Sequence, residues 1–286
     1  MTIGVGFLCN DGVVLGSDTE ESYEESKTSV NKIEVIAKTF CHSGIVASGR
    51  SQIIEYIVPQ IRSLLETDWQ NNGNIEAQLK HLMPEIYQSK AMKAFPARQP
   101  EDKLVDLLVA CRPRGKKAAL FQIHSSLVTR ISSAAVVGCG PIRDVAEEFD
   151  KFSLTTRKAA WAALYVVYLA KERWPGIGGL SQILKIWNNG KMDDERVWDQ
   201  PRREKLFSSY RFLNHIMLLE TTNIETQDER FNKMANVFIG HLRDLRKQVR
   251  QIEYEYLKHK YKTDLNAKLT KTIFRKLLAD QAKAND

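Results

Sequence analysis

The sequence predicts an α+β protein that consists of a four-layer αββα sandwich and a C-terminal helical extension. Along residues 1–198, blocks of short strands alternate with pairs of helices in the hydrophobic pattern. The order is strands, two helices, strands, two helices, strands, so two sheets covered by helices on their outer faces would form four layers. Residues 199–286 show only helical periodicity and a different charge. We therefore predict two domains, 1–198 and 199–286.

The first element is a β-hairpin at the N-terminus. Two runs rich in Val, Leu and Phe flank Asn10-Asp11-Gly12, which is a strong hairpin signal. Residues 19–28 are polar and acidic and predict an exposed loop. Residues 33–36 and 39–47 predict two more strands, and the second is almost entirely apolar, which indicates a buried strand.

Apolar residues then recur at three- and four-residue steps and predict helices over 51–68 and 75–94, the second bent at Pro84. The elements expected after them are strands over 104–111, 118–123, 126–131 and 134–138, helices over 142–149 and 155–173, and strands over 180–187 and 192–197. The last two strands flank Asn188-Asn189-Gly190-Lys191, which is again a strong hairpin turn.

The composition is that of a globular cytoplasmic protein. Of the 286 residues, 43% are hydrophobic and 27% are charged. No apolar run approaches the about 18 residues of a membrane span, and no signal-peptide pattern begins the chain. We therefore expect no membrane partner. The four cysteines, Cys9, Cys41, Cys111 and Cys139, lack metal-ligand spacing, so we expect reduced thiols and neither a metal nor a cofactor.

The C-terminal domain carries the whole formal net charge of +7, because residues 201–286 contain 18 Lys and Arg against 11 Asp and Glu. A short heptad seam is predicted there at Phe238, Leu242, Leu245, Val249, Ile252 and Tyr256. With a further helix over 264–282, we expect a helical hairpin that packs on the core or on a partner subunit. Acidic residues interrupt the basic surplus and no nucleic-acid motif accompanies it, so we do not expect a nucleic-acid partner.

Thr2 acquires a chemistry of its own if Met1 is removed. Its hydroxyl is then a nucleophile, and its own α-amine can accept the proton. The pKa of a free α-amine is about 7.7–8.0, close enough to neutral for a base. The alternative is an ordinary edge hairpin in which Thr2 is a terminal stub.

Thr2, Asp18, Lys32 and the turn Gly44-Ile45-Val46-Ala47-Ser48-Gly49 occur in the order found at the start of proteasome β-subunits. Over residues 2–195 the chain resembles the threonine-type N-terminal-nucleophile (Ntn) hydrolases, which include these subunits and small bacterial proteasome-like peptidases. The resemblance implies the Ntn-hydrolase fold and the cleavage of peptide bonds. It also implies that Thr2 is the nucleophile and that Asp18, sixteen residues later, and Lys32 are its catalytic partners.

The resemblance extends to two further catalytic positions. Ser48 falls where the family has a Gly whose backbone N–H forms the oxyanion hole. Cys139, in Gly138-Cys139-Gly140, falls where a Ser supports the threonine amine. There is also one departure, because Trp174 and Ile177 stand where the family has an Asp and a Ser before a pair of glycines. The support that this Asp–Ser pair gives to the amine is therefore lost.

The resemblance also implies a substrate pocket and an assembly. The positions that shape the first specificity pocket fall near Glu20, Val30, Val46 and Arg50, and Val46 indicates an apolar wall. We expect a peptide or protein substrate and a homo-oligomer, such as a ring or stacked ring, with an unfoldase as a further partner that the sequence does not identify. Two other functions remain open: an Ntn amidase that acts on small amides, and a non-catalytic assembly subunit, which the lost Asp–Ser pair favours.

Overall fold

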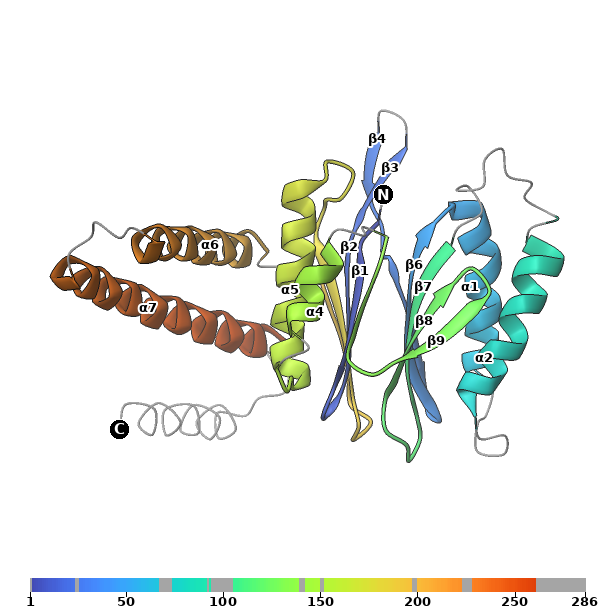
Figure 1. The fold of residues 1–286 in the computed structure, drawn as a ribbon. Helices are drawn as coiled ribbons and strands as arrows, with labels where there is room; N and C mark the ends of the chain where they lie inside the picture. The colour runs from blue at the N-terminus through green and yellow to red at the C-terminus, as the bar shows by residue number, and fades with distance from the viewer. Residues whose placement is uncertain are drawn as a thin grey trace. The chain divides into compact units, whose positions relative to one another are not determined.

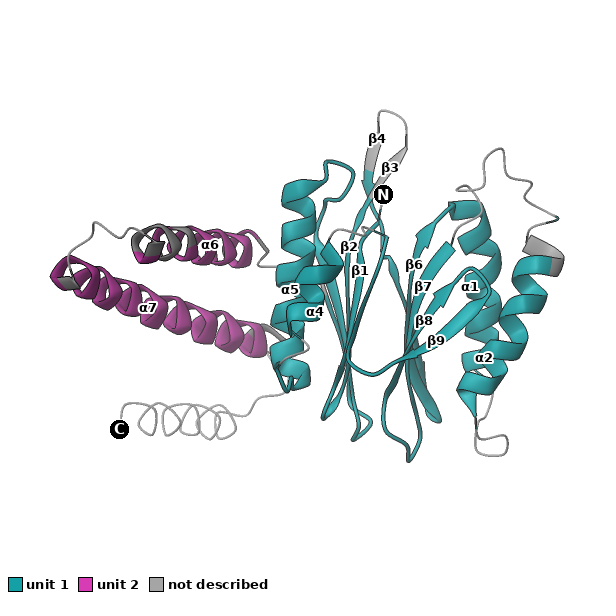
Figure 2. Ribbon diagram, viewed as in Figure 1, with its two compact units in different colours: residues 1–200 teal, residues 201–286 magenta. Residues whose placement is uncertain are grey.

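The computed structural model describes residues 2–23, 26–66, 74–91, 93, 105–138, 142–149, 152–196, 200–222 and 228–260. The chain divides into two compact units, Met1–Gln200 and Pro201–Asp286 (Figure 2). Among the described residues, no helix combines the length and the apolar character that crossing a membrane requires.

Two five-stranded antiparallel sheets form the centre of the first unit (Figure 1). The first sheet has the order β10-β1-β2-β11-β12, with bounds Ala134–Val137, Gly4–Cys9, Gly12–Asp18, Ser181–Trp187 and Met192–Arg196. The second has the order β5-β6-β7-β8-β9, with bounds Ile33–Lys38, Cys41–Gly49, Val105–Pro113, Ala119–His124 and Leu127–Ile131. A separate two-stranded ribbon pairs β3 (Glu20–Tyr23) with β4 (Ser26–Ser29).

Helices cover the outer face of each sheet (Figure 1). On the second sheet, α1 (Ser51–Leu65) packs on β6 and α2 (Ile75–Pro84) packs on β9. On the first sheet, α5 (Thr156–Arg173) packs on β1, β2 and β11, and α4 (Arg143–Glu148) packs on β10. These layers confirm the predicted αββα sandwich. Pro84 ends α2, and the chain continues as the π-helix η1 (Glu85–Ala91).

The exposed loop predicted over residues 19–28 is wrong, because the described part of this segment forms strands β3 and β4. The two strands are paired from Glu20 opposite Ser29 to Tyr23 opposite Ser26. This segment has no alternating apolar pattern that would have signalled strands. Its strand structure is therefore defined by backbone pairing, which a search for hydrophobic periodicity does not detect.

The alternation of side chains along β6 separates two cores. Val46 is fully buried between the two sheets, together with Leu15 and Leu184. Ile45 points to the other face and packs with the buried stripe of α1. That stripe repeats at four-residue steps, as the sequence predicts, and consists of Ile53, Ile57, Ile61 and Leu65. One strand therefore contributes alternate residues to the centre of the sandwich and to the layer below α1.

A charged cluster is buried within the first sheet. Lys185 on β11 lies 2.8 Å from Glu195 and 3.2 Å from Asp193, both on β12. These side chains are at most 11% exposed. Burial alone would lower the pKa of Lys185, but Glu195 and Asp193 more than compensate, so the pKa is raised. The positive charge of Lys185 thus compensates the buried charges of Asp193 and Glu195, and these two carboxylates in turn favour the charged form of Lys185.

The second unit contains α6 (Gln200–Thr222) and α7 (Asp228–Lys260). Both helices line a cavity of about 350 Å³, with Phe212 and Leu213 from α6 and Phe238 and Leu245 from α7. Every residue of the predicted heptad seam is at least partly buried, and Ile252 is fully buried. The predicted helix over 264–282 lies outside the described residues.

Candidate active site

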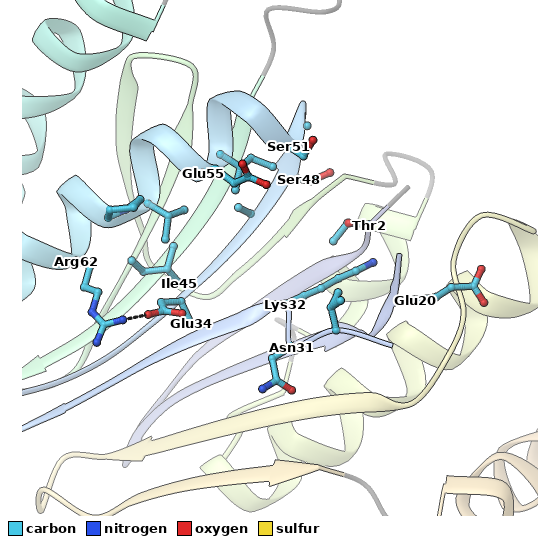
Figure 3. Close-up of a pocket in the computed structure, with 16 residues that line it drawn as sticks. Thr2, Glu20, Asn31, Lys32, Glu34, Ile45, Ser48, Ser51, Glu55 and Arg62 are labelled. Carbon is cyan, nitrogen blue, oxygen red and sulfur yellow. Dashed lines mark hydrogen bonds and ion pairs between the residues drawn. The ribbon is translucent and has the colours of Figure 1, made fainter. Parts of the chain in front are cut away.

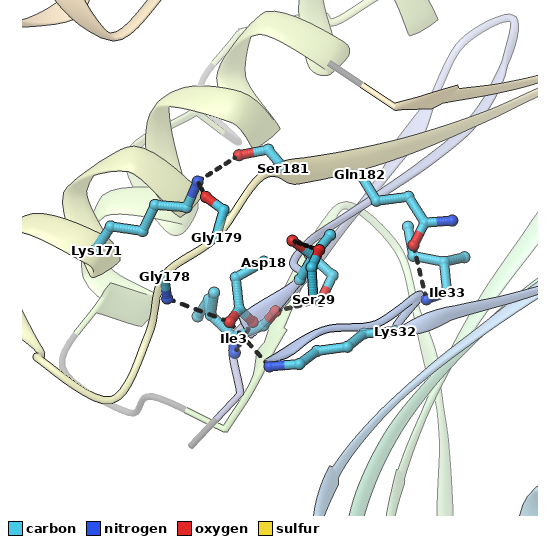
Figure 4. A network of polar contacts seen from close by, with 12 residues as sticks. Ile3, Asp18, Ser29, Lys32, Ile33, Lys171, Gly178, Gly179, Ser181 and Gln182 are labelled. Atoms are coloured by element: carbon cyan, nitrogen blue, oxygen red, sulfur yellow. Dashed lines mark hydrogen bonds and ion pairs between the residues drawn. The ribbon is translucent and has the colours of Figure 1, made fainter. Parts of the chain in front are cut away.

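The N-terminal segment is tied to the end of β2. Strands β1 and β2 pair with Gly4 opposite Ser17. This register brings the backbone of Ile3 to the side chains of Ser17 and Asp18. The Ile3 N–H donates to Asp18 Oδ1 at 3.1 Å, and the Ser17 hydroxyl donates to the Ile3 carbonyl at 2.8 Å. The hydrogen bond from Ile3 to Asp18 (Figure 4) therefore anchors the residue that directly follows Thr2.

Asp18 is fully buried and joins three segments of the chain. In addition to Ile3, its Oδ2 accepts from Lys32 Nζ at 2.9 Å and from the Gly178 N–H at 3.4 Å (Figure 4). The Lys32 side chain is only 9% exposed. A buried carboxylate needs such donors, because an uncompensated charge in this environment is strongly disfavoured. Asp18 thus fixes both the N-terminal segment and the ammonium of Lys32.

Gly138, at the end of β10, lies between Thr2 and Ser48. Its φ of +90° favours glycine. A Cβ atom at this position would clash with the Thr2 carbonyl oxygen and would lie 2.8 Å from Ser48 Oγ. The absence of a side chain therefore allows the ends of β10 and β6 and the N-terminal segment to meet. Cys139, the next residue, lies outside the described residues.

A pocket of about 1060 Å³ opens at this meeting point (Figure 3). Thr2, Lys32 and Ser48 line it together, although they are 30 and 16 residues apart in sequence. From there the pocket extends along β6 and the first turns of α1, where its lining includes Ile45, Ala47, Ile54, Glu55, Val58 and Pro59. The structure thus brings three predicted catalytic residues to one cavity, with Asp18 buried behind Lys32.

The four residues predicted to bind substrate do not all reach this pocket. Glu20 and Val30 line it, but Val46 and Arg50 do not. Val46 is instead fully buried in the core between the two sheets, and its neighbours Ile45 and Ala47 form the apolar wall of the pocket. Arg50 is the residue that precedes α1, and its side chain makes no capping hydrogen bond. The sequence predicted Val46 as a wall of the pocket, but the wall is formed by the residues on either side of it.

A family model described as proteasome subunit matches residues 2–179. The chain belongs to the proteasome subunit family. No curated protein sequence gives a significant match.

Solved structures of proteins called Anbu share the fold. A Gly-1 mutant of Anbu from Hyphomicrobium sp. strain MC1 is 12% identical, with a TM-score of 0.62, and the match covers 76% of this chain and 99% of that chain. Anbu from Yersinia bercovieri, described as an ancestral beta-subunit, is 12% identical with a TM-score of 0.62 and coverages of 79% and 99%. A helical assembly of the Anbu complex from Pseudomonas aeruginosa is 14% identical with a TM-score of 0.62 and coverages of 76% and 95%. At these identities the likeness concerns the fold alone.

Residues 174–179, the segment in which we expected a departure from the family pattern, reach Asp18 through Gly178. Ile177 is buried and does not offer a hydroxyl. The next residue, Gly178, donates its N–H to Asp18, and its carbonyl accepts from the N–H groups of Thr19 and Glu20 at 3.3 and 3.2 Å. The Glu20 carboxylate also lies against Gly178, so a Cβ atom at this position would require the Glu20 side chain to move. The sequence reasoning missed this backbone donor, and the Gly178-Gly179 pair was the signal that could have indicated it.

The described thiols are poor candidates for a nucleophile in this proteasome-family chain. Burial, with a contribution from Asp11, raises the pKa of Cys9 to about 12. Burial also raises the pKa of Cys41 and, with a contribution from Cys41, that of Cys111. These thiols stay protonated near neutral pH, and only the thiolate is a good nucleophile. Among the described residues, no group of three or more His, Cys, Asp and Glu side chains is placed to hold a metal ion.

Proposed function

We propose that this chain is a threonine-type peptidase of the proteasome-like Ntn-hydrolase class, with Thr2 as the nucleophile after removal of Met1. The observation that carries the proposal is that Thr2 and Lys32 line one pocket, while the buried Asp18 holds both Lys32 and the residue after Thr2. The mechanism needs a hydroxyl, a cation beside it and a buried carboxylate behind the cation, which here are Thr2, Lys32 and Asp18. The family match over residues 2–179 supports the same reading.

In the proposed reaction, Thr2 Oγ attacks the carbonyl carbon of the scissile peptide bond, and its proton passes to the α-amine of Thr2. The positive charge of Lys32 favours the neutral form of that amine, because a like charge nearby disfavours its protonated form. The protonated amine then gives its proton to the leaving nitrogen as the C–N bond breaks. The resulting ester between Thr2 and the substrate is hydrolysed by water, which regenerates the hydroxyl.

Backbone donors complete the proposed site. The Ser48 N–H is assigned to the oxyanion, since only a backbone donor is needed there and removal of such a donor costs about 10²–10³ in rate in other enzymes. Cys139 is assigned to support of the Thr2 amine. We propose that the Gly178 N–H takes over part of the ordering that the missing Asp and Ser provide in the family, because it binds Asp18 directly.

We further propose that the chain acts as a homo-oligomer in the cytoplasm, with residues 1–198 as the Ntn-hydrolase domain and residues 199–286 as a helical extension. Membership of the proteasome subunit family favours assembly. The Anbu structure from Pseudomonas aeruginosa, a helical assembly, offers an open helix as an alternative to a closed or stacked ring. An unfoldase partner would deliver folded substrates to such an assembly.

Intact-mass measurement followed by peptide cleavage tests the proposal. The purified full chain should lack Met1 and should cleave at least one peptide of a fluorogenic panel. Thr2→Ala should lower kcat/KM by at least about 10³, whereas Thr2→Ser, which keeps a hydroxyl, should retain much more activity. Equal cleavage by wild type and Thr2→Ala would reject Thr2 as the nucleophile.

The change at Trp174 and Ile177 favours one competing function, a non-catalytic assembly subunit. A chain that assembles by native mass but shows no Thr2-dependent cleavage of peptides or small amides would support this alternative. Cleavage of small amides without cleavage of peptides would instead indicate an Ntn amidase. The three functions are therefore separated by one panel of substrates and one pair of proteins.

A further inference from the structure

Gln182 on β11 is a buried polar residue that reaches from the first sheet to the second. Its side chain is 1% exposed and lies on the same face of β11 as Leu184, which packs in the core between the sheets. Its Oε1 accepts from the Ile33 N–H at 3.1 Å (Figure 4). Its Nε2 donates to Asp194 Oδ1 at 3.2 Å. These two partners fix the orientation of the amide, because the N–H needs an acceptor and the carboxylate needs a donor.

The Ile33 N–H depends on this contact because of its place in the second sheet. Strand β5 begins at Ile33 and lies at the edge of its sheet, next to β6. An edge strand leaves the backbone groups of its outer side without a strand partner, and water usually binds them. Ile33 is only 3% exposed, and a buried N–H without an acceptor is costly. The amide of Gln182 therefore takes the place of water at the first residue of β5.

The same contact holds the base of Lys32. The N–H of Ile33 belongs to the peptide group that joins Lys32 to Ile33, so Gln182 binds the backbone of the lysine at its carboxyl side. The other end of the lysine, its ammonium, lies 2.9 Å from Asp18. Both Gln182 and Asp18 belong to the first sheet. One sheet thus holds Lys32 at its backbone and at its charged end.

Gln182 can serve as such a support because its own strand is anchored. It pairs directly with Ser17 on β2, whose hydroxyl donates to the Ile3 carbonyl. The preceding residue, Ser181, accepts a hydrogen bond from Lys171 Nζ at 3.0 Å (Figure 4). A single position of β11 therefore lies between the contact that holds the N-terminal segment and the contact that holds the lysine before β5.

We propose that Gln182 is a positioning residue of the site and sets the distance of the Lys32 ammonium from the Thr2 amine. The inference rests on the proposed peptidase function. In that function the charge of Lys32 favours the neutral amine, and the effect weakens as the two groups move apart. Gln182 does not line the pocket, so it acts through Lys32. Without its amide, the Thr2 amine should bind its proton more tightly and accept the hydroxyl proton at higher pH only.

The test compares wild type with Gln182→Met, which keeps the length of the side chain but has no amide, in the full chain and with a peptide that wild type cleaves. We expect kcat to fall by about 10-fold, since a misplacement of 1 Å can cost about 10²-fold in rate. KM should change by less than about 2-fold, because the contact with substrate is unchanged.

The pH profile separates positioning from a merely structural role. The acid limb of kcat/KM reports the free amine and should move to higher pH by about 0.5 unit, a part of the about 1–3 units that a neighbouring charge produces. The variant leaves the other charged groups in place, so the shift reports Lys32. These groups are Asp18 behind Lys32, Asp194 beside Gln182, and the pocket residues Glu20, Glu34, Glu55 and Arg62.

Gln122→Met is the matched control, because Gln122 on β8 also donates across the sheets, to the Val136 carbonyl at 3.4 Å. Its loss removes a contact between the sheets that does not adjoin Lys32, so kcat and the pH profile should stay those of wild type. Gln182→Asn, which keeps an amide but is one methylene shorter, is a second and milder variant. It should shift the acid limb in the same direction as Gln182→Met. Urea midpoints verify that the proteins compared are folded.

Two outcomes would overturn this inference alone. The first is Thr2-dependent cleavage with the acid limb of wild type in both Gln182 variants, and the second is an equal shift in Gln122→Met. In either case Gln182 only joins the sheets. Absence of Thr2-dependent cleavage in wild type would instead overturn the proposed function and the inference with it.

Discussion

Lys32 Nζ lies 2.9 Å from Asp18 Oδ2, and neither side chain is more than 9% exposed. The two residues come from different sheets of the sandwich, because Asp18 ends β2 of the first sheet and Lys32 directly precedes β5 of the second. Since Asp18 also accepts from the Ile3 N–H, the same carboxylate links the N-terminal segment to both sheets. The position of Thr2 therefore depends on a buried ion pair between the layers.

Asp18→Asn should destabilise the protein strongly. The amide keeps the size of the side chain, but it cannot balance the charge of Lys32. Removal of one partner from a buried pair costs about 3–5 kcal/mol in the free energy of unfolding. Urea denaturation measures this loss. Asp18→Asn combined with Lys32→Met should recover part of it, because the uncompensated cation is then removed as well. An unchanged urea midpoint in Asp18→Asn would show that the pair contributes nothing to stability.

Gly138→Ala should damage the site, whereas Gly115→Ala should not. Both glycines have positive φ, +90° and +75°, so alanine costs about 1–2 kcal/mol at either position. Only at position 138 would the new Cβ clash with the Thr2 carbonyl oxygen, since nothing lies within 4 Å of a Cβ at Gly115. We expect Gly138→Ala to lose about 1–3 kcal/mol more in unfolding free energy. It should also lose Thr2-dependent cleavage. Equal effects of the two substitutions would argue against close packing at Thr2.

Much of the sandwich could be predicted because one face of each element is buried. The turn at Asn10-Asp11 joins Cys9 to Gly12, which pair directly, as the hairpin signal indicated. The four-residue repeat of apolar residues likewise predicted which side chains of α1 are buried. Where the two faces of an element do not differ in polarity, the prediction failed. The strands β3 and β4 have a polar sequence and pair through their backbones, so periodicity could not reveal them.

The sequence could predict only those parts of the candidate site that appear as particular residue types in a fixed order along the chain. Thr2, Asp18, Lys32 and Ser48 follow a linear pattern, and the fold brings Thr2, Lys32 and Ser48 to one pocket. Val46 was assigned to the wrong face, because a shift of one residue along a strand exchanges the two faces. The Gly178 N–H was missed because every residue except proline has a backbone donor, and only the Gly178-Gly179 pair in the sequence indicated a close approach of the backbone.

Lys185→Met should destabilise the first sheet. The substitution removes the cation that lies within 3.2 Å of both Asp193 and Glu195 and leaves two carboxylates buried beside each other. The expected loss of unfolding free energy is about 3–5 kcal/mol, as for other buried pairs that lose one partner. Thermal or urea unfolding measures it, with Lys247→Met as a control, because Lys247 pairs with Asp244 on the exposed surface. A loss no larger than that of the control would mean that water compensates the two carboxylates.

Stability should fall at alkaline pH in part because of Cys111. Burial raises the pKa of this thiol above its ordinary value of 9.0. Above pH 9 the unfolded chain therefore releases the thiol proton while the folded chain keeps it, so the unfolded state becomes relatively more favourable as pH rises. The contribution of Cys111 is fully present below its unfolded pKa and decreases by at most about 1.4 kcal/mol per pH unit above it. In Cys111→Val, which has no proton to release, this component is absent. The difference in unfolding free energy between wild type and Cys111→Val, measured in urea from pH 7 to pH 10.5, should thus be constant up to about pH 8.5 and then move in favour of the variant. A difference that stays constant over the whole range would show that the thiol titrates alike in both states, which its complete burial does not allow.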